Sequence, residues 1–319
     1  MPASTPEGGV ADHLDEPHQR CALLGLADEP LAGTSPHAPR WLLVEDPGPW
    51  GRDGLADGTL PAAVRAHIGT QVAAHDVRHQ ALRRVDRSRV ATRRVMLVNV
   101  AAGWMAATSL SVAGLADLDV GLVAATSPPD GWDRITTPLV AVCTHAKRDA
   151  CCALWGRPLA LSLAARLPGV VWETSHTGGH RFAPSVLTFP DGGVHGRVAD
   201  AAGFATSVVT GRIPLATYRG NSALIHPAQA AEVAVRHDQD LDGHGDVTVE
   251  EVTVSGTTAL VTVTTASGSH RVQVQQQSLP ARATSCGGDP KVPESWLVTA
   301  LDGRPVNDVS VGGQPMGTA

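Results

Sequence analysis

Short apolar runs separated by turn residues predict the strands of the first third of the chain. Residues 41–45 (WLLVE) predict a buried strand that ends in the Pro- and Gly-rich turn DPGPWGRDG. Apolar positions near helical spacing predict a helix over residues 60–84. Two further apolar runs, at residues 95–99 and 121–125, predict strands. This order of strand, helix and strands predicts a small α/β domain over residues 21–136.

The middle third alternates in the same way and places Cys and His side chains after its strands. Residues 138–145 (PLVAVCTH) predict a strand that brings Cys143 to a loop, and a helix follows in RDACCALWGRPLALSLAARLPG. Residues 170–176 (VVWETSH) predict a second strand that brings His176 to a loop. A hairpin in APSVLTFPDGGVHGRV and a short helix in ADAAGFATSVVTG complete a unit over residues 137–222. Loops at strand ends can bring side chains from different strands together.

The last third has a different sequence pattern. A short helix over residues 226–237 precedes alternating polar and apolar positions, with turns at Ser255-Gly256 and Ser267-Gly268. Residues 223–319 are therefore expected to form a β-rich domain and tail. Residues 1–20 are polar and mixed in charge and are expected to be a flexible N-terminus.

Composition narrows the class of protein. The 319 residues are 43% hydrophobic and carry a net charge of -6, which gives no reason to expect binding to nucleic acid or to anionic membranes. The first residues lack the basic and apolar parts of an export signal, and polar residues dilute the apolar segment 95–116 too much for a membrane helix. Five cysteines, three of them within ten residues, suit a reducing compartment and metal or redox use, so a cytoplasmic location is expected.

Two pairs of metal-ligand side chains stand out. Cys143 and Cys152 have eight residues between them, and His176 and His180 have three. If the pairs converge, they form a Cys2His2 site. A zinc peptidase is disfavoured, because Gly-Gly breaks the helix that such a His pair needs and no Glu follows the first His. A structural zinc ion and a [2Fe–2S] cluster both remain, and the wide Cys spacing favours the cluster.

Several local motifs resemble one protein family. The blocks Cys143-Thr144-His145, Lys147-Arg148-Asp149, Cys151-Cys152, Trp172-Glu173 and the run from His176 to Ala183 (HTGGHRFA) resemble the sucrase/ferredoxin-like family, as does WLLVEDPGPWGRDGL near the N-terminus. The resemblance implies a thioredoxin-like ferredoxin domain over residues 137–222. The expected fold class is thus α/β, with this core between an N-terminal α/β domain and a small β-rich C-terminal domain.

The same resemblance implies the cofactor and its ligands. It implies a [2Fe–2S] cluster bound by Cys143, Cys152, His176 and His180. Two neutral imidazoles in place of two thiolates change the charge of the oxidised cluster from about -2 to about 0, which places its potential in the Rieske range.

This chemistry favours a soluble one-electron carrier over an enzyme with its own substrate. Its partner is then an unidentified redox protein, a reductase or an electron acceptor. A zinc-stabilised structural or interaction module is the first alternative. A thiol oxidoreductase of thioredoxin-like fold is the second, although the chain has no C-x-x-C pair.

The remaining marked residues receive simpler interpretations. Cys151 is expected to pack beside the cofactor, and Cys21 and Cys286 to be isolated buried thiols. Asp149 is expected to pair with Arg148 and brace the loop. One basic cluster is expected to be a solvated helix end and loop, or a docking face for an acidic redox partner: Arg83, Arg84, Arg87, Arg89, Arg93 and Arg94.

Overall fold

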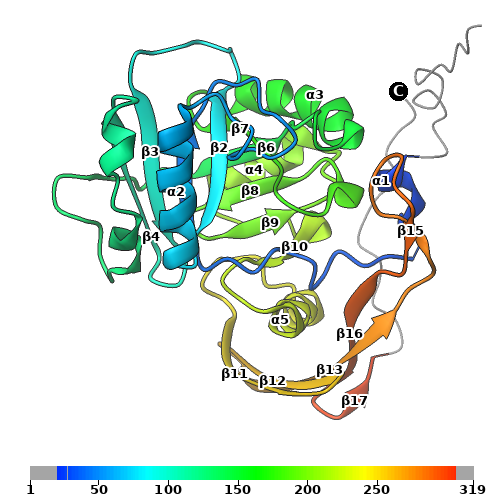
Figure 1. The fold of residues 1–319 in the computed structure, drawn as a ribbon. Helices are drawn as coiled ribbons and strands as arrows, with labels where there is room; N and C mark the ends of the chain where they lie inside the picture. Colours follow the sequence, from blue (N-terminus) through cyan, green and yellow to red (C-terminus); the bar gives the residue numbers. More distant parts are fainter. Residues whose placement is uncertain (1–19, 27, 307–319) are drawn as a thin grey trace, which may run out of the picture.

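The structure is a computed structural model that describes residues 20–26 and 28–306 (Figure 1). Most of the predicted flexible N-terminus, residues 1–19, lies outside the described residues. Within them the chain has the mixed α/β character that was predicted. It is built on a large ten-stranded sheet and a separate five-stranded sheet.

The first third of the chain forms one half of the large sheet. Strand β1 (Arg40–Glu45) pairs in parallel with β2 (Arg78–Arg84), and helix α2 (Ala62–Ala74) links them. The strands that follow pair antiparallel, in the order β3 (Arg93–Asn99), β4 (Trp104–Leu110) and β5 (Asp133–Arg134).

Two sequence predictions for this half are wrong. The helix expected over residues 60–84 ends at Ala74, and its last part is strand β2, because this backbone hydrogen-bonds to β1 within the sheet. The strand expected at residues 121–125 is a 3₁₀ helix, η3 (Val120–Ala124), which begins where the Asp119 carboxylate accepts the N–H of Gly121. Sheet pairing and a local cap outweigh the apolar pattern at these positions.

The middle third forms the other half of the sheet. Helix α3 (Ala150–Arg166) links the parallel strands β6 (Leu139–Cys143) and β7 (Val171–Thr174). After β7 come the 3₁₀ helix η4 (His180–Phe182), β8 (Val186–Phe189), β9 (Gly193–His195), α4 (Ala201–Thr210), the 3₁₀ helix η5 (Leu215–Thr217) and β10 (Tyr218–Asn221).

The two halves repeat one strand order. The order β7-β6-β8-β9 matches β2-β1-β3-β4, and the halves join where β2 and β7 pair antiparallel. Each half therefore has two parallel strands linked by a helix, followed by antiparallel strands. Sheet pairing continues across the predicted domain boundary after residue 136.

The large sheet is strongly curled. Trp41 on β1 and Phe189 on β8 are four strand positions apart, which is about 19 Å in a flat sheet with about 4.8 Å between strands. Their ring centroids are only 5.4 Å apart. One apolar core fills the inner side of this curl and contains residues of both halves, whereas two further cores lie on the outer side under α2 and under α3 and α4 (Figure 1).

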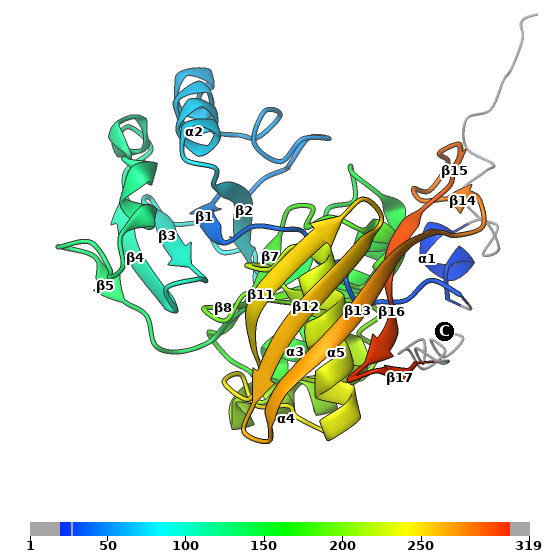
Figure 2. The same ribbon diagram turned by 90° about the horizontal axis from the view of Figure 1, so that it is seen from below.

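The last third forms a second layer. Helix α5 (His226–Gln239) contacts β10 on one side and the five-stranded sheet on the other, and Figure 2 shows this curved sheet passing over α5. The sheet consists of β11 (Thr248–Ser255), β12 (Thr258–Thr265), β13 (Gly268–Ser278), β16 (Glu294–Leu301) and β17 (Arg304–Pro305).

A small hairpin near the C-terminal end of the described chain packs against its N-terminal segment. Strands β14 (Arg282–Ala283) and β15 (Pro290–Lys291) pair with each other beside α1 (Cys21–Leu24), as Figures 1 and 2 both show. Arg282 donates two hydrogen bonds to the carboxylate of Asp28, which ties the hairpin to the N-terminal segment. No helix in the described part of the chain is long and apolar enough to span a membrane.

Candidate metal centre

The structure places the four predicted ligand residues near the ends of β6 and β7 and brings three of them, Cys143, Cys152 and His176, into one close group. Cys143 is the last residue of β6, Cys152 lies in the first turn of α3, His176 follows β7, and His180 begins the 3₁₀ helix η4 (His180–Phe182). One donor atom from each of Cys143, Cys152 and His176 lies within 4.8 Å of the others. The Nδ1 atom of His180 is 3.4 Å from Nε2 of His176.

A close contact between helix and strand holds the two cysteines near each other. Gly156 lies on α3 directly over the end of β6, where an added Cβ would be 2.0 Å from the carbonyl oxygen of Cys143. Only a glycine lets the helix approach this strand so closely. This approach sets the position of Cys152, one turn earlier on α3, relative to Cys143.

The loop that carries the histidines is held in an unusual conformation. Gly178 and Gly179 have φ angles of 95° and 71°, in the left-handed region that favours glycine. Three consecutive carbonyl oxygens of the loop accept hydrogen bonds from side chains: His176 from Gln80 at 3.2 Å, Thr177 from Arg78 at 3.1 Å, and Gly178 from Arg219 at 3.3 Å. The donors lie on β2 and β10, so the sheet itself fixes the His loop.

His145 positions the backbone of His176 through a hydrogen bond. The Nδ1 atom of His145 accepts the backbone N–H of His176 at 3.1 Å. The proton is then on Nε2, which donates to the carbonyl oxygen of Gly51. Burial lowers the pKa of His145, so this neutral form is favoured. The sequence placed His145 in the Cys loop, but its contact with the His loop follows only from the fold.

The protonation states suit a metal centre. A hydrogen bond from Cys152 lowers the pKa of Cys143, and the same bond raises the pKa of Cys152, so Cys143 is the thiol of the pair that loses its proton first. Burial lowers the pKa of His180, against the attraction of Asp149. His180 is therefore held neutral, which is the form that binds metals.

Asp149 contacts more groups than predicted. Instead of pairing with Arg148, its carboxylate accepts the N–H of Cys151 at 2.9 Å and caps α3. The same carboxylate lies 3.8 Å from Nε2 of His180. A metal-bound His commonly turns its second nitrogen toward a carboxylate in this way.

The two cysteines and the two histidines differ in exposure. Cys143 and Cys152 are buried, whereas both imidazoles are partly exposed. Beside His176 lies a hollow of about 320 Å³ whose lining includes Arg52, Arg78 and Arg148. The histidine side of the centre therefore faces solvent and is flanked by arginine side chains.

Three of the six arginines of the basic cluster singled out in the sequence form ion pairs with buried glutamates. The expected helix end is wrong, because Arg83 and Arg84 lie on β2, but Arg87 and Arg89 lie in an exposed loop, as expected. Arg83 and Arg87 pair with the buried Glu173 at 2.7 and 3.0 Å, and Arg157 pairs with it too. Glu173 also accepts a hydrogen bond from Thr144, next to Cys143. These arginines hold the carboxyl-terminal ends of β6 and β7 in place.

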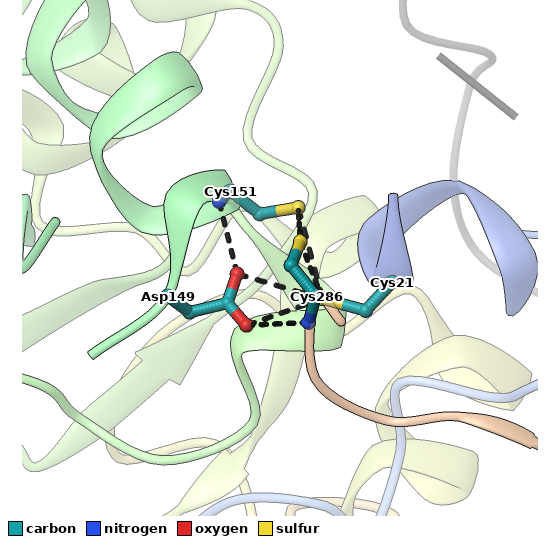
Figure 3. A group of neighbouring side chains, drawn as sticks. All are labelled: Cys21, Asp149, Cys151 and Cys286. Atoms are coloured by element: carbon teal, nitrogen blue, oxygen red, sulfur yellow. Dashed lines mark hydrogen bonds between the residues drawn. The ribbon is translucent and has the colours of Figure 1, made fainter. Parts of the chain in front are cut away.

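The prediction that Cys21 and Cys286 are isolated thiols is wrong. They meet Cys151 and Asp149 in a second group of possible metal ligands next to the first (Figure 3). Cys151 and Cys152 are adjacent in sequence but face different groups. This convergence depends on the fold of distant segments and has no local sequence signal.

Fold and site together define an α/β protein with two neighbouring groups of Cys, His and Asp side chains suited to metal binding. A protein-family model described as sucrase/ferredoxin-like matches residues 31–219. The chain belongs to this family. Comparison with curated proteins and with solved structures finds no match.

Proposed function

We propose that this protein is a one-electron carrier whose [2Fe–2S] cluster is bound by Cys143, Cys152, His176 and His180. The observation that carries the proposal is the convergence of these side chains, with three donor atoms within 4.8 Å and His180 next to His176. When bound, such a cluster accepts and releases single electrons at a potential set by its ligands.

The donor set fits the cluster by its chemistry. Two buried sulfurs and two neutral imidazoles reduce the negative charge that surrounds the irons, compared with four thiolates. Cys143 and Cys152 must both lose their protons when a metal binds, because thiolates are the ligand form. The Asp149 carboxylate lies 3.8 Å from the second nitrogen of His180, on the side that such a carboxylate takes beside a metal-bound histidine.

The strand order supports a thioredoxin-like ferredoxin domain over residues 137–222. In the order β7-β6-β8-β9, helix α3 links the parallel pair and α4 follows the antiparallel hairpin. We propose that this unit carries the cluster, while the first half of the sheet supplies the clamp from Gln80 and Arg78.

The histidine side is the proposed site of electron exchange with a partner protein. The imidazoles are partly exposed, and Arg52 and Arg148 are exposed beside them. Complementary charge steers such encounters, so an acidic surface on the partner fits this region. The inference explains why the ligand cysteines are buried while the histidines are not.

Metal and sulfide analysis tests the proposal. The purified full chain is expected to be coloured and to hold about two irons and two acid-labile sulfides. Cys143→Ala is expected to lose both, with the fold retained by circular dichroism.

The compact donor set also suits a single zinc ion. A zinc-stabilised structural or interaction module is therefore the second candidate function. A colourless chain in which Cys143→Ala removes zinc and no iron is present would establish that candidate and refute the carrier.

A further inference from the structure

A second group of ligand side chains lies beside the proposed cluster site. Cys21 begins α1, Cys151 lies in the first turn of α3, and Cys286 lies between β14 and β15. Figure 3 shows their sulfur atoms facing one another, with the carboxylate of Asp149 alongside. The donor atoms of all four residues lie within 4.8 Å of one another.

The spacing of these atoms is that of ligands around one ion. Cys21 Sγ is 3.7 Å from the sulfur of Cys151 and 3.7 Å from that of Cys286, and it is 3.6 Å from Oδ1 of Asp149. Bond lengths of about 2.3 Å to sulfur and about 2.1 Å to oxygen place tetrahedral sulfurs about 3.8 Å apart and sulfur and oxygen about 3.6 Å apart.

The third sulfur pair is closer. Cys151 and Cys286 are 3.1 Å apart, so their sulfur atoms must separate by about 0.7 Å to bind one ion. An iron–sulfur cluster would divide the four donor atoms between two or more irons, and ligands on different irons lie farther apart than the donor atoms of this group. The geometry therefore favours a single small ion over a cluster.

The surroundings of this group are those of a closed site. Cys21, Cys151 and Asp149 are buried, and the Asp149 oxygens are oriented by the backbone N–H groups of Cys151 and Cys286 at 2.9 and 2.8 Å. Among the described residues, His180 at 3.8 Å is the sole ion-pair partner of Asp149. Asp149 also accepts the Ser285 hydroxyl at 3.2 Å, so its carboxylate is held in place beside the three sulfurs (Figure 3).

We propose that Cys21, Cys151, Cys286 and Asp149 bind one structural zinc ion. Thiolate-rich, four-coordinate sites without an open position are typical of structural zinc. Each thiol that binds loses its proton to solvent, so three thiolates, one carboxylate and Zn²⁺ leave the site with a net charge of about -2. The ion joins three remote segments: α1, the start of α3 and the β14–β15 hairpin.

This site would also fix the first turn of α3. Cys151 faces the zinc group, whereas Cys152 lies 3.8 Å from Nδ1 of His176 in the other group. Cys21 and Cys286 both lie outside residues 31–219, which the family model matches. The inference does not rest on the proposed electron-transfer function.

Metal analysis of matched variants separates the two sites. The full chain, purified without chelators, is expected to hold about one zinc per chain by mass spectrometry of the elements. Cys286→Ser and Cys21→Ser are expected to lose most of this zinc and to retain iron. The control Cys143→Ala is expected to lose iron and to retain zinc, so failure of one proposal is distinguishable from failure of the other.

Cobalt substitution keeps the test decisive if a serine variant does not fold. Cys143→Ala, refolded with Co²⁺, is expected to show the intense visible bands of tetrahedral cobalt thiolate without interference from iron.

The zinc proposal is overturned if these bands are absent, or if Cys21→Ser and Cys286→Ser both keep full zinc. A Cys151–Cys286 disulfide in the purified chain, detected by peptide mass after alkylation, would also overturn it, because it removes two of the ligands.

Discussion

The contact between Gly156 and the Cys143 carbonyl makes a sharp prediction about the substitution Gly156→Ala. The new Cβ would be 2.0 Å from that oxygen, whereas such contacts are essentially never below 3.0 Å. The start of α3 must therefore move away from β6 by about 1 Å, several times the ~0.2 Å tolerance of metal–ligand distances. We expect a loss of about 1–3 kcal/mol in unfolding free energy from overpacking.

Gly69 supplies a matched control on another helix. It lies within α2, and no atom is within 4 Å of an added Cβ. Gly69→Ala is therefore expected to raise stability by about 0.5–1 kcal/mol through helix propensity alone.

Guanidinium unfolding and iron content are measured on both variants. Gly156→Ala is expected to lose stability and most of its iron, while Gly69→Ala keeps its iron. Unchanged stability and iron in Gly156→Ala would refute the argument that this close approach places the ligand cysteines.

Three further predictions concern charge. His180→Cys is expected to keep iron but to lower the midpoint potential by roughly 100–350 mV, because one thiolate adds negative charge; an unchanged potential in protein-film voltammetry would rule out His180 as a ligand. Glu173→Gln is expected to destabilise the fold by about 3–5 kcal/mol, because Arg83 and Arg87 lose their buried partner; wild-type urea unfolding would contradict this. Burial lowers the pKa of His195 to about 3, so its neutral form stabilises the fold above about pH 6.5 and this stability is lost as the pH falls toward 3. His195→Gln is expected to reduce the fall in unfolding free energy between about pH 6.5 and pH 3. An unchanged slope of unfolding free energy against pH would contradict this prediction.

Local patterns predicted the elements that carry the proposed ligands. Cys143 and His176 each follow a short apolar run, and the helix between them ends just before Pro168-Gly169, so their placement after β6 and β7 was predictable. Parallel neighbours end at the same edge of a sheet, which brings the two loops together.

Features that depend on distant segments were not predictable. The basic residues of β2 suited a helix or loop locally, and only pairing with β1 makes them a strand. Cys21 and Cys286 are separated by 265 positions, and no short-range pattern indicates that they meet. Gly156 did leave a signal, since a glycine inside an apolar helix pattern often marks close backbone contact.

The support of the histidine loop was also hidden from the sequence. Gln80 and Arg78 lie nearly one hundred residues before the carbonyl groups that they bind. Arg219 reaches the same loop from β10 on the opposite side in sequence. Such clamps follow from the curled sheet and from the junction of β2 with β7, which no periodicity reveals.

The most direct test of the central claim is pulsed electron paramagnetic resonance of the reduced protein labelled with ¹⁵N-histidine. The account predicts hyperfine couplings from two histidine nitrogens, with one coupling lost in His180→Cys and one in His176→Cys. A reduced cluster without any ¹⁵N-histidine coupling, or with couplings that persist unchanged in both variants, would contradict it.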